Sequence, residues 1–169
     1  MRALVTGAGS GIGRATAEVL TERGYEVVAT ARRAEVMEGL EVAERLVLDV
    51  TSDESVAACV AQAGAIDILV NNAGITETGP LETYPHDVLL KMFETNVFGP
   101  MRMIRALVPA MRTRGEGVVV NVTSVEGKVA APLAGAYCGT KHALEALSES
   151  LSFEIGHFGT TTNRGRFDK

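Results

Sequence analysis

The sequence has little of what marks a metal site, a disulfide framework or a nucleic-acid partner. Its 169 residues include no tryptophan, two cysteines and three histidines. Cys59 and Cys138 lie far apart without a Cys-x-x-Cys spacing, and no histidine has a partner at ligand spacing. We therefore expect neither a disulfide framework nor a metal site. The formal net charge of −5 argues against nucleic acid or an anionic membrane as a partner, because both favour a basic face.

Long apolar runs are also absent. No stretch approaches the roughly 18 residues that span a bilayer, and Met1-Arg2 leads directly into a short strand pattern, so no signal peptide is predicted. A hydrophobic fraction of 46% beside 22% charged residues is ordinary for a globular protein in water. We expect a cytoplasmic protein with no membrane partner.

Short β-branched runs alternate with helical patterns along the chain. The expected strands are 3–6, 26–30, 45–50, 67–74 and 117–124, and the expected helices are 15–24, 55–64, 85–111 and 137–155. The strand runs are continuously apolar, which is typical of strands buried on both faces. This order predicts an α/β fold with a doubly wound parallel sheet.

A glycine-rich turn, TGAGSGIG (6–13), joins the first strand to the first helix. It fits G-x-x-x-G-x-G, with Gly7, Gly11 and Gly13, and not the commoner G-x-G-x-x-G. Glycines allow a tight turn and a close approach of the backbone to a pyrophosphate, and the N–H groups of the following helix then face the phosphates. The turn therefore predicts a Rossmann dinucleotide site, to which Ser10 and Ile12 also belong.

The end of the second strand indicates which dinucleotide binds. NAD-binding proteins of this fold place a carboxylate there, about 20 residues past the glycines, to bind the ribose 2′-hydroxyl. Here Ala31 takes that place, and Arg32 and Arg33 follow it. A guanidinium suits a 2′-phosphate. The sequence thus favours NADP(H) over NAD(H).

Tyr137 and Lys141 form a Tyr-x-x-x-Lys pair on a helical pattern, which puts both side chains on one helix face. Ser124 ends the fifth strand, at the edge where doubly wound sheets bind ligands. Asn96 stands in mid-helix, where its poor helix propensity is unfavourable without a role.

These segments together resemble the short-chain dehydrogenases/reductases of the single-domain type. The resemblance rests on TGAGSGIG, LDV (48–50), NNAG (71–74), ETNVFG, NVTSVEG and YCGTK, in that order, and it covers residues 1 to about 159. Ser124 precedes Tyr137 by 13 residues, as is usual in the family. The wording is most similar to members acting on hydroxysteroids and retinol.

The resemblance implies a hydride transfer between NADP(H) and a carbonyl or secondary alcohol. It implies four catalytic residues: Tyr137 as general acid or base, Lys141 lowering the pKa of that phenol and holding the nicotinamide ribose, Ser124 holding the substrate oxygen with Tyr137, and Asn96 anchoring a relay water. It also implies that Asp49 and Val50 contact the adenine, and that Asn71, Ala73 and Gly74 contact the adenosine ribose and a phosphate. A homodimer or homotetramer is expected, built on the helices 100–111 and 142–155; alternatively both helices pack only on their own sheet.

The ending departs from the family. Residues 160–169 contain one large apolar side chain, Phe167, so we expect no sixth strand and no substrate loop there, only a tail after a domain of residues 1–159 that is incomplete at its end. An omitted segment, a truncated or frameshifted chain, and a minimal domain all fit this expectation. A catalytically silent nucleotide-binding or dimerisation module is therefore the alternative function. A nucleotide-sugar epimerase also uses Tyr-x-x-x-Lys, but NNAG and the short chain argue against it.

Overall fold

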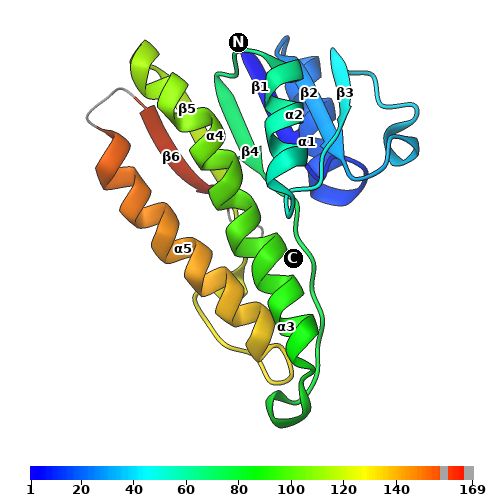
Figure 1. Ribbon diagram of the computed structural model, residues 1–169, viewed down its shortest axis with the longest axis vertical. Helices are drawn as coiled ribbons and strands as arrows, with labels where there is room; N and C mark the ends of the chain where they lie inside the picture. Colours follow the sequence, from blue (N-terminus) through cyan, green and yellow to red (C-terminus); the bar gives the residue numbers. More distant parts are fainter. Residues whose placement is uncertain (157–159, 166–169) are drawn as a thin grey trace.

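The computed structural model describes residues 1–156 and the backbone of residues 160–165. Six parallel strands form one sheet in the order β3-β2-β1-β4-β5-β6 (Figure 1). The strands are β1 (Arg2–Thr6), β2 (Glu26–Ala31), β3 (Glu44–Val47), β4 (Ile68–Asn71), β5 (Gly117–Val122) and β6 (Thr160–Gly165). The chain winds outward from β1 in both directions, which confirms the predicted doubly wound fold.

Five α-helices connect the strands: α1 (Gly11–Glu22), α2 (Asp53–Ala63), α3 (His86–Phe93), α4 (Gly99–Arg114) and α5 (Gly135–Ile155). Residues of α1 pack on one face of the sheet, and residues of α2, α4 and α5 pack on the other. Figure 1 shows α3 and the first turns of α5 extending beyond the sheet. In the part of the chain described, no helix is long and apolar enough to cross a membrane.

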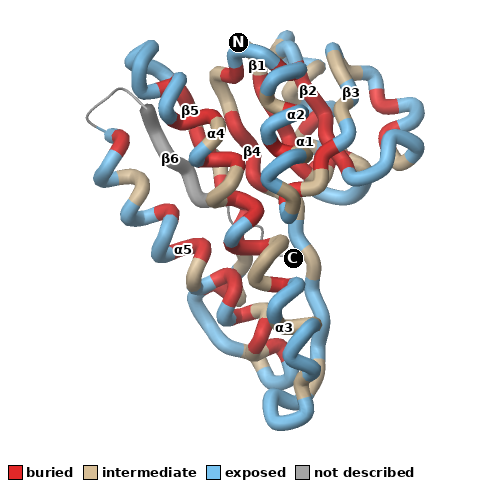
Figure 2. The backbone as a smooth tube through the Cα atoms, viewed as in Figure 1, coloured by how far each residue is buried: buried red, intermediate tan, exposed pale blue. Residues whose placement is uncertain are grey.

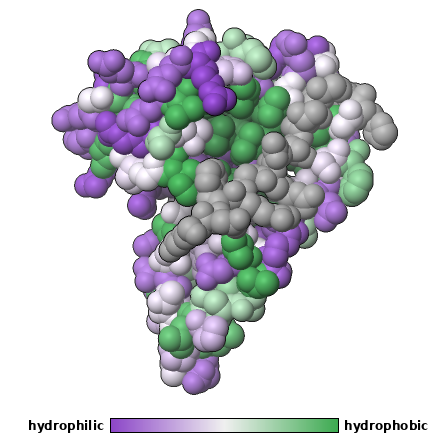
Figure 3. All heavy atoms as spheres, turned by 180° about the vertical axis from the view of Figure 1, so that it is seen from behind, coloured by the Kyte–Doolittle hydropathy of each residue, from purple (hydrophilic) through white to green (hydrophobic). Residues whose placement is uncertain are grey.

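The central strands are apolar along their whole length because both of their faces are covered. On β1, Leu4 belongs to the core that α2 and α4 complete, whereas the next residue, Val5, belongs to the core under α1. Both are fully buried, and each contributes roughly 1.5–3 kcal/mol through burial. Buried residues accordingly concentrate along the strands (Figure 2). From behind, hydrophobic residues gather near the middle of the sheet-containing part, with hydrophilic ones at its margin (Figure 3).

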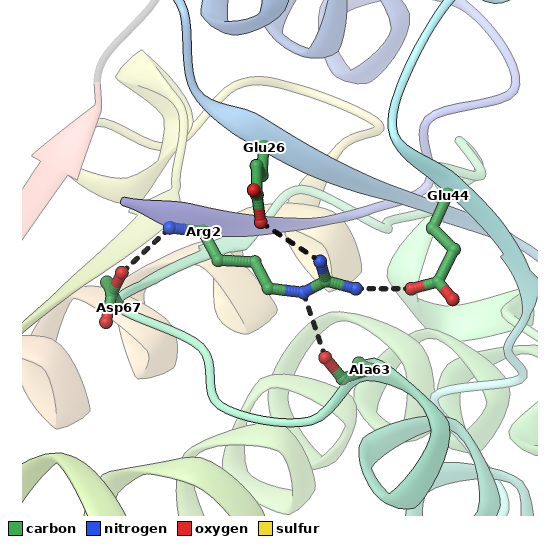
Figure 4. Close-up of polar contacts among 5 residues, drawn as sticks. All are labelled: Arg2, Glu26, Glu44, Ala63 and Asp67. Carbon is green, nitrogen blue, oxygen red and sulfur yellow. Dashed lines mark hydrogen bonds and ion pairs between the residues drawn. The ribbon is translucent and has the colours of Figure 1, made fainter.

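Arg2, at the start of β1, bonds to residues at the amino-terminal ends of β2, β3 and β4 (Figure 4). Its main-chain N–H donates to Asp67 at 2.8 Å, its Nε donates to the Ala63 carbonyl at 3.0 Å, and its guanidinium pairs with Glu26 and Glu44. This cluster lies at the edge opposite to the carboxyl ends of the strands, so it supports the sheet and takes no part in the site described below.

The expectation that residues 160–169 contain no strand is wrong for Thr160–Gly165. This segment forms β6 and pairs in parallel with β5, from Gly117↔Thr160 to Val122↔Gly165. A strand ladder is made by main-chain N–H and C=O groups, and three consecutive threonines favour extended backbone without apolar side chains. β6 covers the edge of β5 that would otherwise stay unpaired. The predicted boundary at Gly159 lies outside the described residues.

The predicted helix 85–111 is interrupted. Between α3 and α4 the backbone makes a π-helical turn, Glu94–Phe98, in which Asn96 and Val97 are buried. Such turns frequently occur at functional sites. The interruption explains how a residue of poor helix propensity is accommodated in the middle of this segment.

Candidate active site

A cleft of about 450 Å³ opens at the carboxyl ends of β1, β2 and β4. Nine of the predicted cofactor residues line it: Gly7, Ser10, Ile12, Arg32, Arg33, Asp49, Val50, Ala73 and Gly74. Gly11, Gly13, Asn71, Tyr137 and Lys141 are not among its lining residues. Eight further residues of the lining were not predicted to bind the cofactor: Gly9, Ala31, Val36, Leu48, Thr51, Asn72, Ile75 and Thr95.

The glycine turn has the geometry of an anion cradle. Gly7 and Gly11 have φ of +71° and +54°, values that other residues rarely adopt. A Cβ on Gly13 would overlap the Asn72 amide and the Gly7 carbonyl, so this glycine lets α1 close on the end of β1. Ser10 caps α1 without a side-chain hydrogen bond, and the first turn carries no acidic residue. The helix N-terminus is therefore open to a phosphate group.

Two arginines stand at the end of β2. Arg32 and Arg33 follow Ala31, are exposed and line the cleft. Neither has a hydrogen-bond or ion-pair partner among residues 1–156. Two guanidinium groups that have no hydrogen-bond partner among residues 1–156 and lie along the same cleft as the glycine turn fit an additional phosphate on the ribose.

Asp49 lines the cleft as a carboxylate. Burial disfavours its charge, but the Thr51 amide and hydroxyl donate to Oδ1 at 2.9 and 2.8 Å. With the nearby charges of Arg32 and Arg102, these hydrogen bonds hold the pKa of Asp49 below its ordinary value. One carboxylate oxygen is thereby fixed, and the side chain stays an acceptor at neutral pH. Thr51 belongs to no motif or apolar pattern in the sequence, so the sequence did not predict its contact with Asp49.

In NNAG, it is the second asparagine that reaches the glycine turn. Asn71 is buried within the sheet and donates to Asn121 Oδ1 at 2.9 Å. Asn72 donates from its side chain to the Thr6 and Gly7 carbonyls, and its main-chain N–H donates to Thr6 Oγ1. Asn72 and Thr6 thus join the ends of β4 and β1 under the cleft. The family resemblance implied a cofactor contact for Asn71, whereas the structure places Asn72, and not Asn71, in the lining of the cleft.

Tyr137, Lys141 and Ser124 come together at the start of α5, as predicted. Lys141 Nζ lies 5.6 Å from the centre of the Tyr137 ring and donates to the Val122 carbonyl at 3.0 Å. Burial raises the pKa of Tyr137, and a hydrogen bond with the Ser124 hydroxyl lowers it in part. Burial also lowers the pKa of Lys141 to about 8. The cluster therefore holds a protonated phenol beside an ammonium group that is readily deprotonated.

The side-chain oxygen and nitrogen of Asn96 both form hydrogen bonds. Its Oδ1 accepts from the Ile75 N–H at 2.8 Å, and its Nδ2 donates to the Ile75 carbonyl at 2.8 Å and to Thr140 Oγ1 at 3.1 Å. The π-helical turn thus links the loop after β4 to α5. The anchoring of a relay water by Asn96 stays a prediction.

Gly74 connects the cleft to the tyrosine cluster. A Cβ on Gly74 would lie 3.3 Å from Asn96 Oδ1 and 3.8 Å from Lys141 Nζ. Gly74 itself lines the cleft, so the cleft and the Lys141 ammonium lie on either side of this glycine. Within the described residues, no group of three or more His, Cys, Asp and Glu side chains is arranged to hold a metal. Burial raises the pKa of the Cys59 thiol to about 11, which makes it unreactive.

Comparisons with known proteins agree with this arrangement. The family model for short chain dehydrogenases matches residues 1–164. A 3-ketodihydrosphingosine reductase from Bacteroides thetaiotaomicron is 37% identical over 159 residues, covering 92% of this chain and 58% of that protein. Retinol dehydrogenase 8 from Homo sapiens is 39% identical over 168 residues, covering 92% and 54%. The chain thus spans little more than half the length of these curated relatives.

Solved structures share the fold. A short-chain dehydrogenase from Streptomyces avermitilis superposes with a TM-score of 0.91 at 44% identity, covering 96% of this chain and 63% of that one. A metagenomic short-chain oxidoreductase in complex with NADP superposes with a TM-score of 0.94 at 31% identity, covering 100% and 82%.

Proposed function

This chain belongs to the short-chain dehydrogenase family of oxidoreductases, and from that premise we propose that it transfers a hydride between NADP(H) and a carbonyl or secondary alcohol. One observation carries the proposal: Gly74 lines the cleft, and a Cβ built on Gly74 would lie 3.8 Å from Lys141 Nζ. The cofactor site and the acid–base group therefore adjoin. The cradle of Gly7 and Gly11 and the open N-terminus of α1 fit the pyrophosphate of such a cofactor.

NADPH, when bound, supplies the hydride. The chain's own residues handle the oxygen of the substrate and its proton. Ser124 orients the carbonyl oxygen by a hydrogen bond, and Tyr137 Oη donates its proton to that oxygen as negative charge develops there. Lys141 would hold the nicotinamide ribose, and its ammonium stabilises the tyrosinate that remains. In the opposite direction, the tyrosinate accepts the proton of the alcohol.

The transfer is testable with isotopically labelled cofactor. NADPH carrying deuterium at the transferring position is expected to place deuterium on the carbinol carbon of the product, detected by mass spectrometry. The panel should include apolar ketones, because two relatives are named for retinol and 3-ketodihydrosphingosine, and because Val125 and Val129 are exposed just beyond Ser124. If the protein binds NADPH but oxidises it with no ketone of the panel, the silent-module alternative gains and the proposed activity fails.

The preference for NADP(H) is proposed on Arg32 and Arg33. Replacing both with alanine should raise the Kd for NADPH by about 10–100-fold, because charge-assisted hydrogen bonds to the 2′-phosphate are lost, and should change the Kd for NADH less than about twofold. Fluorescence titration measures both constants. Arg105→Ala is the control, an exposed arginine on α4 outside the cleft. Equal weakening of both cofactors would contradict the assignment.

We also propose a homodimer or homotetramer, and a cytoplasmic location. The inner face of α4 packs against its own sheet. On α5, however, Leu147 and Phe153 are exposed, with Phe153 71% accessible. These apolar side chains support a contact between copies, which sedimentation equilibrium would measure.

A further inference from the structure

Glu145 is a buried carboxylate that the proposed chemistry does not use. The residue is 3% exposed. Its Oε1 accepts a hydrogen bond from Thr123 Oγ1 at 2.7 Å, and its Oε2 lies 2.9 Å from Lys128 Nζ. Burying a carboxylate costs several kcal/mol unless partners compensate it. A residue that only filled space here would be apolar, so the charge calls for an explanation.

Glu145 shares a helix face with the catalytic pair. It lies one turn after Lys141 and two turns after Tyr137 on α5, so the three side chains follow one another along the same face. Gly127 packs directly on this face: a Cβ there would lie 3.1 Å from Glu145 Cγ and 3.1 Å from the Lys141 carbonyl oxygen. The segment after β5 therefore lies flat against α5 at this point.

That segment carries Ser124. The turn Val125–Gly127 begins at Ser124, whose Oγ accepts from the Glu126 N–H at 3.2 Å and whose carbonyl accepts from the Gly127 N–H at 2.9 Å. Lys128 closes the turn, donating its N–H to the Val125 carbonyl. Glu145 thus binds the residue immediately before Ser124 and the residue that ends the turn, and it brackets the serine from both sides.

We propose that Glu145, through Thr123 and Lys128, is a positioning residue that holds the Ser124 hydroxyl against Tyr137. The inference rests on the proposed function, because it concerns the serine of that site. The tether runs from the helix that carries the tyrosine to the turn that carries the serine. It fixes the two groups in one frame, and a shift of about 1 Å between such groups is enough to cost up to 10²-fold in rate.

A double-mutant cycle tests the coupling. Glu145→Gln keeps an acceptor for Thr123 but removes the charge that Lys128 binds. It should lower kcat/KM by about 10-fold, mainly in kcat, with the Kd for NADPH changed less than about twofold. In a Ser124→Ala background the same change should cost less than about twofold, since the serine it positions is gone. Lys128→Arg should keep the parent rate, and Lys128→Met should lose part of it.

A second measurement does not depend on turnover. Amide hydrogen exchange at Glu126, Gly127 and Lys128 should accelerate at least about 10-fold in Glu145→Gln, with the amides of α4 unchanged. If the parent protein transfers no hydride, the proposed function fails, and the exchange data alone decide the tether. Unchanged exchange overturns the inference. So does an equal loss of kcat/KM with and without Ser124, because Glu145 would then act elsewhere. Should Glu145→Gln not fold, Lys128→Met replaces it in the cycle and in the exchange measurement.

Discussion

Replacing Tyr137 with phenylalanine is expected to lower kcat for carbonyl reduction by roughly 10²–10⁴-fold, with the affinity for NADPH changed by less than about twofold. The ring is retained and packs as before, but the proton donor is lost. Lys141 keeps its hydrogen bond to the Val122 carbonyl, so the side of the site that faces the cofactor is unaffected. Steady-state rates and a fluorescence titration with NADPH measure the two quantities separately.

Tyr25→Phe is the matched control for this substitution. Tyr25 is partly buried against the core under α1, just before β2 at the amino-terminal edge of the sheet, and should tolerate loss of its hydroxyl without a change in rate. Equal rates for the parent and Tyr137→Phe would remove Tyr137 from the mechanism, whatever the control shows.

The pH dependence of the same reaction follows from the state of the phenol. Burial raises the pKa of Tyr137, against the partial lowering by the Ser124 hydrogen bond, so the phenol stays protonated throughout the neutral range. This is the state that donates a proton, so the phenol itself limits reduction only as the pH rises through its pKa. Loss of the Lys141 ammonium, whose pKa burial lowers to about 8, should slow reduction at lower pH than that. Alcohol oxidation needs the tyrosinate and should accelerate with rising pH. Lys141 is not among the causes of this shift, so the lowering of the tyrosine pKa by Lys141 that the family resemblance implies stays a prediction.

The order of strands and helices could be predicted from the sequence because the apolar pattern shows which segments are buried. Leu4 and Val5 look alike in the sequence since β1 is covered on both faces, and the same holds for β2, β4 and most of β5. The order of strands and helices then places Ser124, Tyr137 and Lys141 at one edge, where the structure has them. Periodicity and glycine spacing suffice for this much.

Polar contacts between distant residues leave no such signal. Asn72 and Thr6 meet across 66 positions, and Thr123 and Glu145 across 22. A threonine or glutamate in the sequence does not reveal which partner it finds. The sequence did not predict β6 for a related reason. This strand is held by main-chain pairing with β5, and a strand rich in threonine has no apolar pattern by which to predict it.

Replacing Lys141 is expected to lower activity and, in the opposite direction, to raise stability. Lys141→Met should lower kcat by roughly 10²–10³-fold, because the ammonium that stabilises the tyrosinate and holds the ribose is lost. The same variant should be more stable than the parent at neutral pH. Lys141 is 5% exposed, and burial lowers its pKa from 10.5 to about 8.

The size and sign of the stability effect follow from that pKa. A shift from 10.5 to about 8 means that burying the ammonium costs about 3 kcal/mol at pH 7, and methionine removes this cost. It also leaves the Val122 carbonyl without its donor, which costs about 1–3 kcal/mol. The difference between the two terms is a rise of up to about 2 kcal/mol in the free energy of unfolding at pH 7, and of up to a few degrees in Tm.

The pH dependence separates this account from a simple packing effect. Between the folded pKa of about 8 and the ordinary 10.5, the unfolded parent binds more protons than the folded one, so the parent gains stability as the pH rises. The advantage of Lys141→Met should therefore shrink across that window and be smallest above it. Urea unfolding from pH 7 to 10.5 measures this, with Lys91→Met, an exposed lysine on α3, as the control. An advantage for Lys141→Met that does not change with pH, or a variant less stable than the parent at pH 7, would show that the buried ammonium does not carry this cost. Under the proposed function this cost has a use: the Lys141 charge would become favourable when a bound ribose and the tyrosinate are there to meet it.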